Sequence, residues 1–171
     1  NLERLNLGRN NIDDRCLQAF AHSSKLSHVR HLNLQFNRIG PEGVRALAAS
    51  PHWTNLESLN LGFNALQDEG IQALAAGFQE TNLTTLNLNQ TQLTDVGVKA
   101  LANSPVFGNL TALHLTHNEI GDDGAKALAA SPHMPDQMLL NIMGNRLGTQ
   151  GVQALKACTH LDTVGFEMQR G

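Results

Sequence analysis

Two histidines, His114 and His117, are the side chains with the clearest capacity for chemistry in this sequence. Two imidazoles can begin a zinc site, but a catalytic zinc takes three protein ligands and a structural zinc takes four. No Asp or Glu stands at the equivalent positions of the neighbouring repeats described below, and His31 lies three repeats away. We therefore expect these histidines to form polar surface or a protein contact, and we predict no metal and no cofactor.

Other catalytic arrangements are also missing from the sequence. We find no nucleophile set beside a base, no glycine-rich phosphate loop and no G-x-S-x-G motif. Cys16 and Cys158 stand where other repeats carry glycine or serine, which gives both a structural explanation. We predict that this chain is not an enzyme.

The two histidines belong to a pattern that recurs along the whole chain. Residues 110–120 read L-x-x-L-x-L-x-x-N-x-I, and the same pattern starts at residues 2, 29, 56, 83 and 137, always 27 residues apart. A shortened copy starts at residue 161. We number these units repeats one to seven and predict one domain over residues 1–171, because a fixed period of this length is typical of stacked repeats.

Each repeat predicts a short strand, a turn and a helix. The leucines of the pattern should point inward from the strand, and consecutive strands joined by a helix must run parallel. The recurring Asn should satisfy backbone groups of neighbouring turns, with Thr91 interrupting this column. Pro41 should begin a helix, and Gly43 should let that helix approach the strand closely. Strands are spaced more closely than helices, so the stack should curve into a solenoid with an inner strand face.

The loops that return from helix to strand should close the core. Leu26, Trp53, Phe107 and Met134 share one 27-residue column, so Trp53 is more plausible as a core residue than as a binding aromatic. Glu80 breaks this column, and we expect Phe78 to fill the gap.

This pattern resembles the leucine-rich repeat, and the 27-residue length with a full helix resembles its ribonuclease-inhibitor-like subclass. The segment 124–129, G-A-K-A-L-A, also resembles GALA-type bacterial effectors, and the Asn-rich repeats resemble Legionella-type effectors. The resemblance implies an α/β horseshoe with parallel strands on the concave face and helices on the convex face. It also implies a partner protein bound on the concave face.

Composition excludes several alternatives. The chain has 12 Lys and Arg against 15 Asp and Glu, a net charge of −3, which argues against binding to nucleic acid. Its apolar runs are too short for a membrane span. The two cysteines fall at opposite ends of the stack, too far apart for a disulfide. Two free cysteines favour a reducing, cytoplasmic compartment. If the chain is a delivered bacterial effector, this compartment is in the host cell.

The sequence opens on a repeat without an initiator Met, so we interpret it as part of a longer chain. The oligomeric state is not predicted by any feature of the sequence.

Candidate binding residues are those that the strands should turn toward the concave side. Phe36 and Phe63 stand at one position of adjacent repeats and could form a hot spot, or they could fold over the rim to shield the turns. Met138, Leu139 and Met143 could form a second apolar cluster, or mark a slipped strand, because Gln137 replaces the first leucine. The Asn column could bind a partner backbone, or could result from repeat duplication alone. The predicted partner-binding residues are Arg30, His31, Asn33, Gln35, Phe36, Asn60, Phe63, Asn87, Gln90, His114, His117, Met138, Leu139, Asn141 and Met143.

The function favoured by these observations is a non-enzymatic protein-interaction module. Its partner would be a host protein, or a bacterial effector or enzyme that it inhibits or regulates. Two alternatives remain: a substrate-recognition domain of a larger ubiquitin-ligase-type protein, and a GTPase-activating regulator, the latter by analogy of fold.

Overall fold

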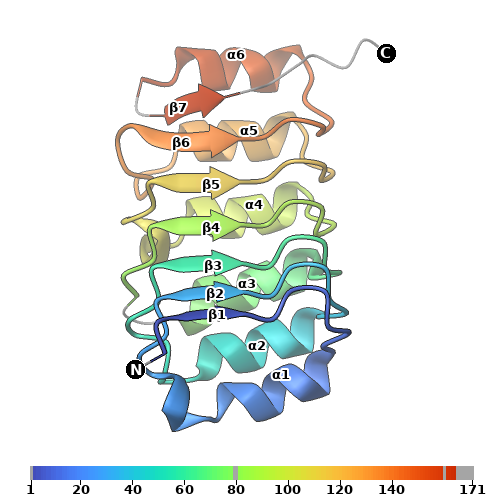
Figure 1. Cartoon of the computed structure of the whole chain (residues 1–171). Coiled ribbons are helices and arrows are strands. Elements are labelled where there is room, and N and C mark those ends of the chain that lie inside the picture. Colours follow the sequence, from blue (N-terminus) through green and yellow to red (C-terminus); the bar gives the residue numbers. More distant parts are fainter. Residues whose placement is uncertain (1, 79–80, 160, 165–171) are drawn as a thin grey trace.

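The computed structural model describes residues 2–78, 81–159 and 161–164. Seven parallel strands form one sheet in the order β1-β2-β3-β4-β5-β6-β7, and the helices cover one of its faces (Figure 1). The elements are β1 (Arg4–Asn6), α1 (Asp14–Ala21), η1 (Ser24–Leu26), β2 (His31–Asn33), α2 (Pro41–Ala49), β3 (Ser58–Asn60), α3 (Gln67–Gly77), β4 (Thr85–Asn87), α4 (Asp95–Ala102), η2 (Pro105–Phe107), β5 (Ala112–His114), α5 (Asp122–Ala129), β6 (Met138–Asn141), α6 (Thr149–Ala157) and β7 (Leu161–Val164).

The register of the sheet follows the repeat. Leu5, Leu32, Leu59, Leu86 and Leu113 pair in series, each 27 residues from the next. These central leucines point toward the helices, and the residues on either side of each leucine point to the open face. The predicted fold class, an α/β solenoid with parallel strands on one face and helices on the other, is confirmed.

One continuous apolar core lies between the sheet and the helices. Trp53 and Phe107 are buried within it at 1% and 0% exposure, which confirms Trp53 as a core residue. Phe78 is also buried in this core, as expected, whereas Glu80 lies outside the described residues. None of the described helices is long and apolar enough to cross a bilayer.

A column of asparagines, the Asn ladder, ties the turns of successive repeats together; its members are Asn37, Asn64, Asn118 and Asn145. The Oδ1 atom of Asn118 accepts hydrogen bonds from the N–H groups of Thr91 and Leu93 in the preceding repeat, at 2.9 and 3.1 Å. Its Nδ2 group donates to the carbonyls of Leu88 and Leu115. Each ladder Asn therefore satisfies backbone groups of two repeats.

Thr91 interrupts the Asn ladder, as the sequence predicts. Its hydroxyl donates to the Leu88 carbonyl within its own repeat. The turn of repeat three has changed in response: Gln67 adopts a left-handed φ of 57°, and its N–H donates to the Thr91 carbonyl. The helix α3 begins from Leu66, which has no side-chain cap bond.

A second column, the Asp ladder (Asp14, Asp68, Asp95 and Asp122), links the starts of the helices. Asp95 Oδ1 accepts from the N–H groups of Gly121 and Gly124 in the next repeat, at 2.7 and 2.9 Å. A Cβ added at Gly124 would lie 2.6 Å from this oxygen. Gly43, Gly97 and Gly151 meet the preceding Asp in the same way, whereas Gly70 packs on Leu66 and Pro41. At four of these positions the glycine therefore makes room chiefly for a neighbouring carboxylate, which is not the close helix–strand approach that we expected for Gly43.

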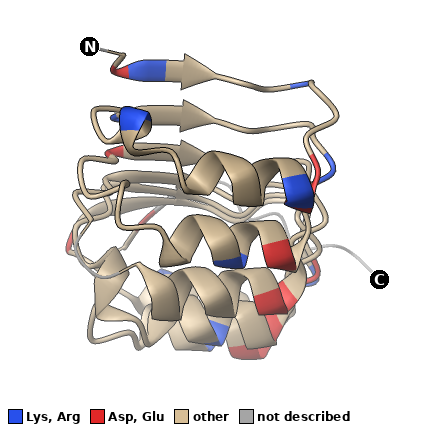
Figure 2. Ribbon diagram, turned by 90° about the horizontal axis from the view of Figure 1, so that it is seen from below, with Lys and Arg blue, Asp and Glu red and all other residues tan. Residues whose placement is uncertain are grey.

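Figure 2 shows acidic residues, coloured red, at the ends where several helices begin. That position suits the positive end of each helix dipole. Pro41 occupies the ladder position in repeat two, so α3 receives no such bond from α2.

A third column, the Ser ladder (Ser50, Ser104 and Ser131), links the ends of the helices. Each hydroxyl donates to a carbonyl in the preceding helix, at Ala21, Ala75 and Ala102 respectively. Gly77 takes the serine position in repeat three, where a Cβ would lie only 2.8 Å from the Cβ of Ala48.

Candidate functional site on the concave face

The face of the sheet opposite the helices is the candidate site, because its side chains are not covered by another layer (Figure 1). Of the fifteen predicted binding residues, the exposed ones are Arg30, Phe36, Phe63, Gln90, His117 and Met143. The half-buried ones are His31, Asn33, Gln35, Asn60, Asn87, His114, Leu139 and Asn141. The remaining residue, Met138, is fully buried.

Phe36 and Phe63 form a stacked pair, the phenylalanine pair, at the rim where the strands end. Their ring centroids are 4.0 Å apart with an interplanar angle of 14°, and each side chain is 36% exposed. The guanidinium of Arg9 lies over the Phe36 ring, 4.3 Å from its centroid. A cation over a ring face and an aromatic stack both fix ring orientation, so this exposed apolar group is ordered before any partner arrives.

The backbone beneath the phenylalanine pair is strained. Phe36 and Phe63 have φ values of 55° and 59°, in the left-handed region that favours glycine and asparagine. Arg9, Gln90 and His117 share this conformation at the equivalent positions, and Gly144 has a φ of 68°. Glycine is accommodated in this column, so the two rings at repeats two and three are not needed to form the turn.

An open hollow of about 660 Å³ adjoins Phe63 on the rim. It is also lined by Arg38, Ala65, Gln90 and Asp14. The arrangement offers a partner an aromatic ring at one edge of a depression that contains both charged and neutral polar groups.

The Asn column of the strand ends has an internal role. Oδ1 of Asn33, Asn60 and Asn87 accepts from the backbone N–H two residues further on, at 3.0, 3.1 and 3.0 Å. Asn141 makes the same bond at 3.4 Å. The amide of Asn60 also donates to Gln35 Oε1. The acceptors of this column are therefore occupied by the chain itself, which explains the column without a partner.

His114 replaces Asn in this column, and a neighbour compensates for the change. The Thr116 N–H, which an Asn at 114 would bind, donates instead to Asn89 Oδ1 at 2.8 Å. Burial lowers the pKa of the half-buried His114 imidazole below its ordinary value of 6.5. His117 is exposed, and a Cβ at Gly144 would lie 2.5 Å from its Nδ1. Within residues 2–78, 81–159 and 161–164, no three His, Cys, Asp or Glu side chains gather as a metal site.

The predicted cluster in repeat six requires a correction. Met138 begins β6, is 0% exposed and pairs with Leu161, so its placement on the concave surface was wrong. Gln137 has a left-handed φ of 62° and an exposed side chain, whereas the first leucine of the other central repeats is buried. Met138 takes the buried place instead and enters the core. Leu139 and Met143, which is 40% exposed, remain on the open side.

Arg30 is the charged member of the predicted set, and it forms an ion pair with Glu57 on the neighbouring repeat. Arg9 was not among the predicted residues, although it holds Phe36 in place. Its position in the same 27-residue column as Phe36 and Phe63 was the signal that could have identified it.

The parallel sheet, the helix layer and the Asn ladder define an α/β solenoid built from repeats with one open strand face. The chain belongs to the leucine-rich-repeat family: the family model "Leucine Rich repeat" matches residues 1–21, 25–48, 52–75, 79–102, 109–129 and 139–156.

Among solved structures, an internalin from Listeria monocytogenes is similar in fold, with a TM-score of 0.60 and 18% sequence identity. The match covers 98% of this chain and 48% of that chain, so this chain spans about half the length of the internalin. A plant ice-binding protein matches with a TM-score of 0.40 and 24% identity over 72% of this chain and 44% of that chain. The search of curated proteins gave no match.

Proposed function

We propose that this chain is a non-enzymatic protein-interaction module that binds a partner protein on its concave face, with the phenylalanine pair as the anchor. The observation that carries the proposal is the stacked, partly exposed phenylalanine pair. Its two rings stand at a turn position that does not require an aromatic residue. The left-handed φ belongs to the repeat, since Arg9, Gln90 and His117 share it; what distinguishes repeats two and three is the pair of rings at this position. Large aromatic side chains at neighbouring positions are typical of hot spots.

The surroundings of the pair fit a docking surface. Arg9 covers the outer face of Phe36, which leaves Phe63 beside Gln90 and the hollow on the rim. A partner side chain could enter this hollow and pack against Phe63 while its main chain runs along the half-buried polar column. Each Nδ2 group of this column has two hydrogens, and Asn60 uses one of its two on Gln35 Oε1, so donors remain for a partner although the Oδ1 acceptors are occupied.

The partner in this proposal is a host protein, or a bacterial effector or enzyme, in a reducing compartment. The resemblance to ribonuclease-inhibitor-like repeats supports a mode of action in which the concave face covers another enzyme's active site. Leu139 and Met143, in repeat six, would extend the contact toward the C-terminal end of the stack.

The test replaces Phe36 and Phe63 together by Asn, because Asn tolerates positive φ and adds no charge. Partners are captured from host cytosol by cross-linking, purified, and titrated against the variant and the parent chain. We expect the double variant to bind at least about 30-fold more weakly, the effect of losing a hot spot worth about 2 kcal/mol.

The matched control is Val96→Asn, because Val96 is a 53% exposed apolar residue on the helix α4, on the opposite face. It should leave the affinity unchanged. If the control weakens binding and the phenylalanine variant does not, the partner binds on the helix side and the proposal fails.

A further inference from the structure

The hollow on the rim beside Phe63 contains an exposed arginine, Arg38. It lines the hollow together with Phe63 and Gln90. Within residues 2–78, 81–159 and 161–164, Arg38 forms no ion pair. Asp14 also lines the hollow, but its Oδ1 accepts a hydrogen bond from the Gly40 N–H at 2.6 Å, at the start of α2, where the positive end of the helix dipole offsets its charge. The hollow therefore presents a positive charge that is available to a ligand.

The same column of the repeat shows what such an arginine does when a carboxylate is near. Arg146 stands four repeats after Arg38 and forms an ion pair with Glu119 of the preceding repeat at 3.1 Å. The residues that flank Arg38 in this column are Asn11 and Ala65, and neither is charged. Repeat two therefore has the arginine of this pair without its acidic partner.

A second cation lies on the other ring of the phenylalanine pair. The Arg9 guanidinium covers Phe36 at 4.3 Å from the ring centroid, and the Arg9 side chain is exposed. The part of the chain that the structure describes contains no ion pair of Arg9. One guanidinium thus lies over Phe36 and another lines the hollow beside Phe63, so an anionic group placed at the rings is attracted by both.

The charge of the chain is divided unevenly, and these two arginines belong to its positive part. Residues 1–45 contain seven Lys and Arg against four Asp and Glu, whereas residues 46–171 contain five against eleven. An acidic partner segment is therefore attracted to repeats one and two and repelled from the later repeats. This asymmetry favours the phenylalanine pair over Leu139 and Met143 as the place where such a segment binds.

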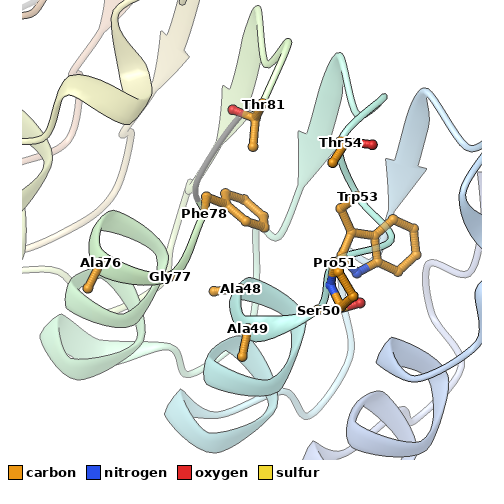
Figure 3. Close-up of a pocket in the computed structure, with 10 residues that line it drawn as sticks. All are labelled: Ala48, Ala49, Ser50, Pro51, Trp53, Thr54, Ala76, Gly77, Phe78 and Thr81. Atoms are coloured by element: carbon orange, nitrogen blue, oxygen red, sulfur yellow. The ribbon is translucent and has the colours of Figure 1, made fainter.

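The pocket at the ends of α2 and α3 differs from the rim hollow in this respect (Figure 3). The described residues that line it are apolar or carry a hydroxyl group, and none of them is ionisable. The two hollows have volumes of about 740 and 660 Å³, so charge rather than size distinguishes the one at the rim.

We propose that the partner segment bound at the phenylalanine pair is acidic, with an apolar side chain next to at least one Asp or Glu. This inference rests on the function proposed above. The apolar side chain enters the hollow against Phe63, and the neighbouring carboxylate binds the Arg38 guanidinium, whose planar fork matches the two carboxylate oxygens. A segment with two carboxylates engages Arg9 as well.

The test selects binders from a library of random short peptides displayed on phage, with the whole chain as the bait. We expect the selected peptides to contain more Asp and Glu than the unselected library, placed next to Leu, Met or Phe. A selected set without this excess of carboxylates, or a selection that yields no binder, would overturn the inference.

Two matched variants then test the role of Arg38 with one selected peptide. Arg38→Gln removes the unpaired charge, and we expect it to weaken binding of the peptide about five- to tenfold. Arg146→Gln removes a charge of the same column that is already paired with Glu119, and it should change the affinity less than about twofold. Replacing the carboxylates of the peptide by amides should remove the difference between Arg38→Gln and the parent chain. Equal effects of the two arginine variants would contradict the inference.

The double variant with Asn at positions 36 and 63 separates this inference from the proposed function. If the selected peptides lack carboxylates and bind the double variant at least about 30-fold more weakly, the phenylalanine anchor is supported and the acidic recognition fails. If the selected peptides bind the double variant as tightly as the parent chain, the anchor itself fails, together with the inference that depends on it. Acidic peptides that lose affinity for both the Arg38 variant and the double variant support both.

Discussion

The junction between repeats four and five and the junction between repeats two and three have the same sheet pairing but differ in the helix layer. At the first, Asp95 and Ser131 bond backbone groups across the junction at the two helix ends, and Asn118 does so in the turn. At the second, Asn64 keeps the turn bonds, but Pro41 and Gly77 replace the Asp and the Ser. The comparison shows that the core, the sheet and the Asn ladder suffice to stack two repeats without the Asp and Ser bonds at the helix ends. The phenylalanine pair lies at the junction with fewer ties, since its two rings come from repeats two and three and stack across that junction.

The largest effect should come from breaking the Asn ladder at a complete junction. Asn118→Ala leaves the N–H groups of Thr91 and Leu93 and the carbonyls of Leu88 and Leu115 without their partner in a buried site. We expect the free energy of unfolding in urea to fall by about 2–4 kcal/mol. Asn10→Ala is the control, because the exposed Asn10 side chain donates a hydrogen bond to the Gly8 carbonyl in its own repeat. If Asn10→Ala lowers the free energy of unfolding as much as Asn118→Ala does, the cross-repeat hydrogen bonds are not the cause.

The second largest effect should come from the Asp ladder. Asp95→Ala removes the acceptor for the Gly121 and Gly124 N–H groups at the start of α5, which is a cap supplied by the preceding repeat. We expect a loss of about 1–2 kcal/mol in the same urea measurement. Asp123 stands in the first turn of α5 but is bonded only to Lys99 on the surface, so Asp123→Ala should change stability by less than about 0.5 kcal/mol.

A smaller gain should come from repairing the interrupted ladder. Thr91→Asn places a side-chain amide where the other ladder residues bond the turn of the preceding repeat, which here is repeat three. We expect the free energy of unfolding to rise by about 1 kcal/mol. Hydrogen exchange should show stronger protection at the amide of Leu66, which precedes α3. Unchanged stability together with unchanged exchange would indicate that the turn around Gln67 has adapted fully to threonine.

The smallest effect concerns pH and His114. Burial holds the pKa of folded His114 below its unfolded value of 6.5, so the folded state disfavours the proton. Stability should therefore fall as pH drops from 6.5 to the folded pKa, and level off below it. His114→Asn should make unfolding less dependent on pH between about 8 and 5, as measured by urea titration at both values, and an identical pH dependence in the two proteins would exclude His114 as the cause.

The fold followed from the sequence because the 27-residue period fixes the strand register directly. The pattern of Leu59, Leu86 and Leu113 determined which side chains enter the core, and the Asn column predicted the ladder. The site was only partly predictable. The column of Arg9, Phe36 and Phe63 was visible, but its left-handed backbone and the cation over the ring depend on geometry that spacing does not reveal.

The error at Met138 has the same physical origin. The left-handed backbone of Gln137 affects only the residue that follows it: Met138 turns into the core, whereas Leu139, Leu140 and Asn141 keep the register of the other repeats. The sequence did not predict the Asp ladder, because an acidic residue in the first turn is also explained by the dipole of its own helix. Only the structure shows that Asp95 caps the helix of the next repeat.

The Asn ladder also has a mechanical consequence. Its bonds join residues 25 to 30 positions apart, so a chain pulled from both ends cannot lengthen without breaking them one repeat at a time. Each rupture frees about 90 Å of contour, since an extended residue spans about 3.3–3.6 Å. Under force the molecule should therefore act as a series of length-limited elastic links.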